Sequence, residues 1–492
     1  MSRVSSQGSI LAQQTPVVPL VPSTVHSFDF VLRASHFELR NVTESRERNW
    51  ADDPFREDED LTELSDSEVE AELEAPAPAL PFKQKTVPLA PLSTVTKRKG
   101  PPDGQSYNNK KRARTRKAQK AQEQENESDS PSSRAIEQAI KPSQSTSVLL
   151  HACELDAAYG AHTGKLGTKK MGSLKRREAE YDVDDLVKEG FNHVKWDGVT
   201  PMPIVEASNR IISCLVGRPN CKSYLQDTEI AHQGMMSEGE QAELTPKGHN
   251  TVCGKRGGFP AFTTGVTMGM GSKTPVLLAP EKQQKGMGGI LQRLMNMTAF
   301  KRISEYQNAA FKLWGLRLYK KYKTTMDFVY EHPKLSHPAR NFSDNNVFAA
   351  AAFNFGGKVR TFKHRDHLNW AFGWCAITAL GKFNPNRSAR LVLWELKLVI
   401  DFPSGSTVLI PSAVITHSNT RIAEGDERTS FTQYTAGAIF RWAENGGMTE
   451  GELKEFDLNA WLEMKDRKKG AASECIQLYS TLEELLVHAY SN

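Results

Sequence analysis

The sequence TFKHRDH at residues 361–367 lies at the centre of a series of short segments that are predicted to be β-strands. Within it, His364 and Asp366 are two positions apart. Residues at positions i and i+2 of a strand point to the same face, so both side chains can reach one metal ion while Arg365 points away. His367 is a competing ligand by residue type, but on a continuing strand it lies on the opposite face from Asp366.

A third ligand is available from a later predicted strand, which ends at His417. Two imidazoles and one carboxylate on one face of an octahedron form the ligand set of non-haem Fe(II) oxygenases. Eleven positions after His417 comes Arg428, and Ser430 follows it. A guanidinium can bind the distal carboxylate of 2-oxoglutarate through paired hydrogen bonds, with a hydroxyl beside it. The alternative reading of Arg428 is an ordinary surface arginine.

The surrounding pattern predicts an α+β protein with a double-stranded β-helix core of the jelly-roll or cupin-like type and flanking helices. Apolar spacing over residues 290–329 predicts two amphipathic helices. The predicted strands, separated by Gly and Pro turns, are residues 347–355, 359–362, 371–380, 391–402, 407–411, 414–417 and 430–442.

Upstream of this core, residues 203–216 read as a β-hairpin, and residues 237–242 with their flanks read as a helix. The Gly- and Met-rich residues 257–272 are expected to form a loop near the mouth of the site or an irregular connection. In the mixed aromatic and basic residues 314–323, the aromatic side chains are expected in the core, although a nucleic-acid surface is an alternative.

The N-terminal residues 1–150 are expected to be disordered, because they hold few large apolar residues. Residues 52–74 carry twelve acids against one arginine, and residues 97–120 carry ten basic residues against one acid. The two basic clusters within residues 97–117 predict a bipartite nuclear-import signal and hence a nuclear protein. A phosphate-binding tail and a solvated charge run without a partner are the alternatives.

Three further regions complete the predicted organisation. Residues 151–185 form a basic transition segment, residues 186–445 the catalytic domain, and residues 446–492 a C-terminal helical extension whose leucines and aromatics pack. The six cysteines show no paired spacing, which indicates a reducing compartment. No signal peptide and no apolar run of about 18 residues are present, so no membrane contact is expected.

Several segments of the predicted core resemble the TET/JBP dioxygenases, in particular the transposon-associated branch of basidiomycete fungi. The likeness extends over residues 196–442, about half of the chain. It rests on NFG at 354–356, HRD at 364–366 with Asn369, AFGWCAITALG at 371–381, LVLW at 391–394, GSTVLIPSA at 405–413 and SFTQYTAG at 430–437.

The resemblance implies Fe(II), 2-oxoglutarate and O2, with oxidation of 5-methylcytosine in methylated duplex DNA to 5-hydroxymethylcytosine and further products. By the same resemblance His364, Asp366 and His417 bind iron, and Arg428 binds 2-oxoglutarate. A methyl group on a stacked base is out of reach, so the base must be flipped before hydrogen is abstracted. Asn369 either bonds the base or braces the metal-binding strand.

The substrate is less firmly indicated than the iron chemistry, because RSAR at 387–390 stands where the family has an Arg-Gly-Gly loop. Four basic residues near the mouth are candidate phosphate contacts or ordinary surface charges: Lys363, Arg365, Arg387 and Arg390. Two alternative functions stay open. One is the same chemistry on N6-methyladenine, RNA or protein, and the other is a transposon-derived nucleic-acid-binding protein without turnover.

Overall fold

The structure is a computed structural model that describes residue 135 and residues 138–165, 180–242, 244, 256–269, 271–335 and 338–490. The acidic block 52–74, the basic block 97–120 and residues 166–179 of the basic transition segment lie outside the described residues. Predictions about disorder, nuclear import or a phosphate-binding tail at the N-terminus are therefore untested.

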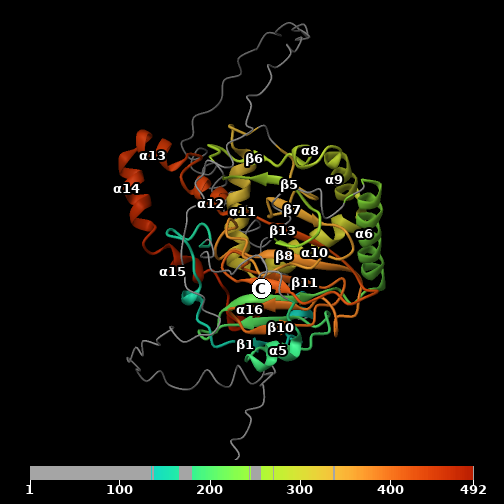
Figure 1. The fold of residues 1–492 in the computed structure, drawn as a ribbon. Coiled ribbons are helices and arrows are strands. Elements are labelled where there is room, and N and C mark those ends of the chain that lie inside the picture. Colours follow the sequence, from blue (N-terminus) through green and yellow to red (C-terminus); the bar gives the residue numbers. More distant parts are fainter. Residues whose placement is uncertain are drawn as a thin grey trace, which may run out of the picture.

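Two β-sheets form the centre of the described chain (Figure 1). Their strands pair antiparallel except for β1 with β3 and β10 with β2. The larger sheet has the order β1 (Thr146–Ser147), β3 (Met202–Val205), β4 (Ile211–Gly217), β11 (Thr407–Ile410), β8 (Cys375–Lys382), β13 (Glu427–Tyr434), β7 (Ala350–Asn354), β5 (Ala261–Thr267) and β6 (Val276–Leu277). The smaller sheet has the order β12 (His417–Asn419), β9 (Leu391–Leu393), β10 (Leu398–Ile400) and β2 (Asn192–Val194).

Helices pack around these sheets. The long helix α6 contacts α9, α10 and β8, and α11 contacts α10 and α12. Figure 1 shows α6 at one side of the molecule and α13 and α14 at the opposite side. The described helices are the 3-10 turn η3 (Ala152–Glu154), α5 (Val183–Lys188), α6 (Lys222–Gln241), α8 (Pro280–Gln283), α9 (Met287–Asn296), α10 (Thr298–Trp314), α11 (Leu316–Glu331), α12 (Gly437–Glu444), α13 (Glu450–Phe456), α14 (Leu458–Arg467), α15 (Ala471–Ile476) and α16 (Leu482–Tyr490).

The contact between α10 and the larger sheet is aromatic at one end and polar at the other. Phe300 packs edge-on against Phe353 of β7 and Phe431 of β13, with ring centroids 5.1 and 5.3 Å apart. Further along, buried Gln433 of β13 accepts a hydrogen bond from Ser304 Oγ and donates one to Gln307 Oε1. Buried polar groups that are fully hydrogen-bonded fix one packing arrangement, so this contact sets the position of β13.

The predicted α+β class is confirmed, and the hairpin over residues 203–216 is confirmed as β3 and β4. The double-stranded β-helix stays a prediction. Residues 237–242 prove to be the end of the much longer helix α6. The aromatic residues of the 314–323 segment are in the core, as expected: Trp314, Tyr319 and Tyr322 are buried.

The prediction of two helices over residues 290–329 is wrong, because the segment forms most of three. Met297 adopts an extended conformation between α9 and α10, and Gly315 has a non-helical conformation that ends α10 before α11 begins. Apolar periodicity continues through both breaks, so it cannot reveal them.

Several predicted strands are also corrected. The segment 430–442 is a strand only to Tyr434, and Gly437–Glu444 is helix α12. The segment 391–402 is two antiparallel strands, β9 and β10, joined by a turn at residues 394–397. Residues 359–362 form no strand, and residues 412–415 form a turn that precedes β12. Within 371–380, the strand begins only at Cys375.

Strand β1 lies before residue 150 and pairs with β3, so the described structure starts within the N-terminal region. The Gly-rich segment 257–272 contains the seven-residue strand β5. In the C-terminal extension Leu482, Leu485 and Leu486 are buried, but three residues that were expected to pack are exposed: Phe456, Leu458 and Leu462. Among the helices that the structure describes, none combines the length and hydropathy needed to cross a bilayer.

Candidate metal and co-substrate site

The three predicted metal ligands meet in one place. His364, Asp366 and His417 each offer a ligand atom, and these atoms lie within 4.8 Å of one another. His364 and Asp366 are carried by an extended loop segment rather than by a strand, while His417 begins β12. A two-residue antiparallel bridge between His364 and His417 supplies the extended geometry, so the i, i+2 relationship still holds.

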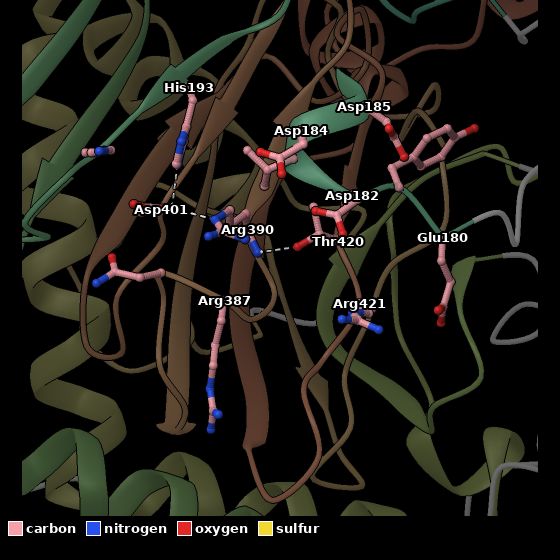
Figure 2. A pocket seen from close by; sticks show the side chains of 14 residues that line it. Glu180, Asp182, Asp184, Asp185, His193, Arg387, Arg390, Asp401, Thr420 and Arg421 are labelled. Carbon is pink, nitrogen blue, oxygen red and sulfur yellow. Dashed lines mark hydrogen bonds and ion pairs between the residues drawn. The ribbon is translucent and has the colours of Figure 1, made fainter. Parts of the chain in front are cut away.

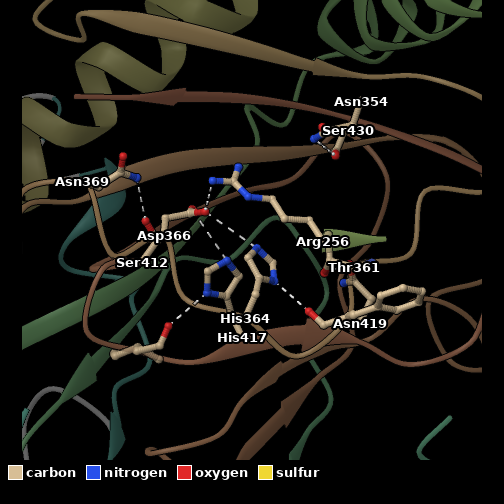
Figure 3. A network of polar contacts seen from close by, with 12 residues as sticks. Arg256, Asn354, Thr361, His364, Asp366, Asn369, Ser412, His417, Asn419 and Ser430 are labelled. Atoms are coloured by element: carbon tan, nitrogen blue, oxygen red, sulfur yellow. Dashed lines mark hydrogen bonds and ion pairs between the residues drawn. The ribbon is translucent and has the colours of Figure 1, made fainter. Parts of the chain in front are cut away.

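Both imidazoles are oriented by backbone carbonyl groups (Figure 3). His364 Nδ1 lies 2.7 Å from the carbonyl oxygen of Phe362, and His417 Nδ1 lies 3.0 Å from that of Ile415. A carbonyl only accepts, so each Nδ1 carries a proton, and in the neutral imidazole Nε2 then has the lone pair that can bind a metal. The two Nε2 atoms lie 3.8 and 3.9 Å from the Asp366 carboxylate oxygens, facing the space between the three side chains.

The charge states of these groups also suit metal binding. Burial, with the nearby His417 imidazole, lowers the pKa of His364 to about 3. Burial by itself raises the pKa of Asp366, but Arg256 and the two imidazoles hold it well below its usual range. Metal ligation requires neutral imidazole and ionised carboxylate, and these are the forms of His364 and Asp366 at neutral pH.

The donor set fits a divalent transition metal. Asp366 Oδ1 is buried and accepts no hydrogen bond of normal geometry, although Arg256 Nη2 lies 3.0 Å away in an ion pair. Two imidazoles and one carboxylate, with room on the opposite side, are the ligands that non-haem Fe(II) uses. His364, Asp366 and His417 are the residues that would hold it.

Arg428 lines the same cavity and is 2% exposed. Its Nη1 donates to the carbonyl of Val359 at 2.8 Å, while its Nε is buried without a partner. Among the residues that the structure describes, no acidic side chain pairs with this guanidinium. Burial lowers the pKa of Arg428 to about 10, which still leaves it charged at neutral pH. A buried charge without a counter-charge is costly, so this arrangement favours an anionic ligand.

Strand β13 places alternate side chains in the cavity. Arg428, Ser430, Thr432 and Tyr434 all line it, as the two-residue period of a strand requires. The intervening Phe431 and Gln433 face α10 instead. Ser430 Oγ accepts a hydrogen bond from Asn354 Nδ2 at 2.9 Å. The Ser430 hydroxyl, which is predicted to lie beside the co-substrate, is therefore positioned by a residue of β7.

Asn369 lies in the cavity of the candidate site, whereas His367 is not among the residues that line it. Asn369 lines the cavity, and its Nδ2 donates to Ser412 Oγ at 3.1 Å. The backbone N–H of Asp366 donates to the carbonyl of the same Ser412. Asn369 and Asp366 are therefore both hydrogen-bonded to Ser412. In the described part of the chain, the group of converging ligand atoms does not include His367.

Sequence reasoning missed two residues of this site. Arg256 comes from far upstream, and its backbone carbonyl accepts from Phe362 N–H. Only the expectation of a loop at the mouth pointed towards that region. Asn419 lines the cavity two positions after His417 and accepts a hydrogen bond from Thr361 Oγ1 at 2.8 Å. The same parity argument that paired His364 with Asp366 would have found it.

A larger and more open pocket lies on the other face of the smaller sheet (Figure 2). It is lined by Arg390, Asp401 and Thr420, whereas their immediate neighbours in the chain, Leu391, Phe402 and Asn419, line the candidate site. Asp401 is buried and accepts from Arg390 Nε at 2.7 Å, with His193 Nε2 2.8 Å away. The buried carboxylate of this pocket is therefore paired with an arginine, whereas the buried Arg428 of the candidate site has no acidic partner among the described residues.

The basic residues considered as phosphate contacts all have protein partners. Arg365 pairs with Glu395 at 2.7 Å, Arg387 with Asp426 at 2.9 Å and Arg390 with Asp401 at 2.7 Å. Lys363 Nζ lies 3.8 Å from the centroid of the Trp394 ring. The structure thus gives each of them a role within the fold.

Comparison with known proteins gives little support of its own. No protein-family model matches the chain, and no curated protein matches it. The chain is similar to a solved structure described as NgTET1 in complex with 5mC DNA, at 11% sequence identity and a TM-score of 0.34. That match covers 53% of this chain and 93% of the other. A TM-score of this size carries no argument about activity, so the function must be argued from the site.

Proposed function

We propose that this chain is an Fe(II)- and 2-oxoglutarate-dependent dioxygenase that oxidises 5-methylcytosine in DNA. One observation carries the proposal above all. Arg428, buried and without an acidic partner among the described residues, lines the same cavity as the His364, Asp366 and His417 cluster. A dicarboxylate co-substrate would supply the missing counter-charge at one end and ligate a metal at the other.

Each residue has a definite task in this proposal. His364, Asp366 and His417 hold the iron, which when bound supplies oxidation of a methyl group with O2 and 2-oxoglutarate. Arg428 binds the distal carboxylate of 2-oxoglutarate, and Ser430 lies two residues along the same face of β13. The apolar wall near Arg428 includes Phe402, whose ring centroid lies 5.9 Å from the guanidinium carbon. In this position the ring limits the access of water to the guanidinium.

The choice of substrate rests on the sequence likeness to the fungal, transposon-associated TET/JBP proteins, to which we propose that the chain belongs. That membership also supports a double-stranded β-helix core within residues 186–445. Asn369 lines the cavity and is the candidate for contact with a flipped base. Nuclear import through residues 97–117 completes the proposal and is supported by their basic composition.

The test uses the full chain with Fe(II), 2-oxoglutarate, ascorbate and a duplex DNA that carries 5-methylcytosine. Nucleosides are quantified by mass spectrometry, and succinate is quantified in the same reaction. We expect 5-hydroxymethylcytosine and further products, in step with succinate. The matched control is the same duplex without methyl groups.

Other outcomes identify the alternatives. Succinate without oxidised cytosine points to another substrate, which parallel reactions with N6-methyladenine DNA, methylated RNA and a histone peptide would reveal. Absence of succinate with every substrate, together with retention on DNA, favours the non-enzymatic nucleic-acid-binding protein.

A further inference from the structure

A compact polar cluster lies directly behind the candidate metal ligands. Glu395 stands on the turn between β9 and β10, and its Oε1 accepts hydrogen bonds from Arg365 Nη2 at 2.7 Å and Thr416 Oγ1 at 2.6 Å. Its Oε2 accepts from the backbone N–H of Thr416 at 2.6 Å. Arg365 Nε in turn donates to Thr416 Oγ1 at 3.0 Å, which closes the ring of contacts.

The positions of these three residues in the chain give the cluster its significance. Arg365 lies between the ligands His364 and Asp366, and Thr416 directly precedes the ligand His417. Neighbouring residues of an extended chain point to opposite faces, so the ligands face the cavity while Arg365 and Thr416 face away from it. Glu395 therefore contacts both ligand-bearing segments on the side that faces away from the cavity.

The backbone between the two segments does not do this alone. The His364–His417 bridge joins the two segments at a single pair of residues. The backbone N–H of Thr416 donates to the Glu395 carboxylate and not to a neighbouring strand. The side chains of Arg365 and Glu395 are only 16% and 21% exposed. A partly buried, charge-assisted ring of this kind holds its members in one geometry better than an exposed ion pair does.

We infer that Glu395 is a positioning residue that sets the mutual orientation of His364, Asp366 and His417 and thereby the affinity of the site for a divalent transition metal. The inference rests on the proposed metal-binding function. Outer partners that orient metal ligands typically contribute about 10- to 100-fold to metal affinity. The three groups that donate to Glu395 belong to Arg365 and Thr416, and both residues are adjacent to a ligand. Loss of the Glu395 carboxylate should therefore affect the metal site more than the stability of the fold.

The experiment measures metal binding directly, without turnover. The full-length chain and its Glu395→Gln variant are titrated with Co(II) under anaerobic conditions, and affinity and the visible absorption bands of bound Co(II) are recorded. We expect the dissociation constant of Glu395→Gln to rise about tenfold or more, with altered absorption bands. Arg365→Lys keeps the charge but loses the Nε contact, so it should show a smaller change in the same direction.

The matched control is Glu238→Gln. Glu238 of α6 also binds an arginine, but it uses both carboxylate oxygens for this, with Arg293 Nε at 2.7 Å and Nη2 at 2.5 Å, and it joins α6 to α9. This control should bind Co(II) like the unmodified chain. Unchanged affinity and spectrum in both Glu395→Gln and Arg365→Lys would overturn the positioning role while leaving the metal site intact, and so would an equal loss in Glu238→Gln. If the unmodified chain binds no Co(II), the proposed metal function itself fails, and this inference fails with it.

Discussion

His364 and His417 donate their backbone N–H groups to each other's carbonyl oxygens, at 3.1 and 2.9 Å. This exchange is the isolated antiparallel bridge that joins the loop after β7 to the start of β12. It holds the two imidazole centroids 4.3 Å apart. The closeness of the two candidate ligands is therefore set by the backbone.

Replacing His364 with alanine should abolish Co(II) binding and 2-oxoglutarate turnover while retention on DNA persists, because the change removes one of three ligands. His367→Ala is the matched control, since His367 is three positions away and outside the ligand group of the described chain. Succinate production and Co(II) titration measure the first effect, and a DNA mobility shift measures the second. Full turnover in His364→Ala would contradict the assignment of this ligand.

Replacing Arg428 with methionine should separate stability from function. The guanidinium is buried without a counter-charge, so methionine removes an unfavourable charge and should leave the melting temperature unchanged or higher. The same change should abolish the stabilisation that 2-oxoglutarate gives the unmodified chain in a thermal-shift assay. Persistent stabilisation of Arg428→Met by 2-oxoglutarate would show that the co-substrate binds elsewhere.

Replacing Gln433 with leucine should destabilise the fold. Its amide oxygen accepts from Ser304 Oγ at 3.0 Å and Asn346 Nδ2 at 2.7 Å, and its amide nitrogen donates to Gln307. Leucine would leave these buried groups unsatisfied, at a cost of about 3 kcal/mol in the free energy of unfolding. Urea denaturation measures the change, and Gln292→Leu on the exposed side of α9 should show little effect.

The stability of the fold should fall as the pH decreases through about 6.5, in part through His232. This histidine of α6 is buried 3.0 Å from Thr429 Oγ1, and burial lowers its pKa below 6.5 against the opposing charges of Glu229 and Glu427. The unfolded chain, whose histidine keeps the ordinary value, takes up this proton first, so acidification favours unfolding.

The measurement is the free energy of unfolding of the unmodified chain and of His232→Gln at several pH values between 7.5 and 5.5. The decrease should be smaller in the variant, since glutamine does not titrate. Parallel curves for the two proteins would mean that His232 is not buried in its neutral form.

The candidate ligands could be predicted from the sequence although the strand beneath them could not. His364 and Asp366 need only an extended backbone to share a face, and an isolated bridge provides that as well as a strand does. By contrast, Arg256 reaches Asp366 only through the tertiary fold, and no local pattern connects two residues so far apart in the chain.

Local patterns also failed where two structures share one apolar pattern. Residues Ile439, Phe440 and Trp442 are all buried and were read as the end of a strand, yet they lie in helix α12. Short apolar runs do not distinguish a buried strand from a buried helix. The exposed Phe456 and Leu458 show that an apolar residue at a suitable spacing need not be buried.

The smaller sheet separates two pockets, the candidate site on one face and the charged pocket on the other. Leu391, Phe402 and Asn419 face the candidate site, and their chain neighbours Arg390, Asp401 and Thr420 face the charged pocket behind it. Inserting or deleting one residue within one of the strands β9, β10 or β12 would shift its side chains by one position and turn the affected ones to the opposite face. A variant of that kind would need a compensating length change in the same strand, or a β-bulge, to keep Leu391, Phe402 or Asn419 in the candidate site.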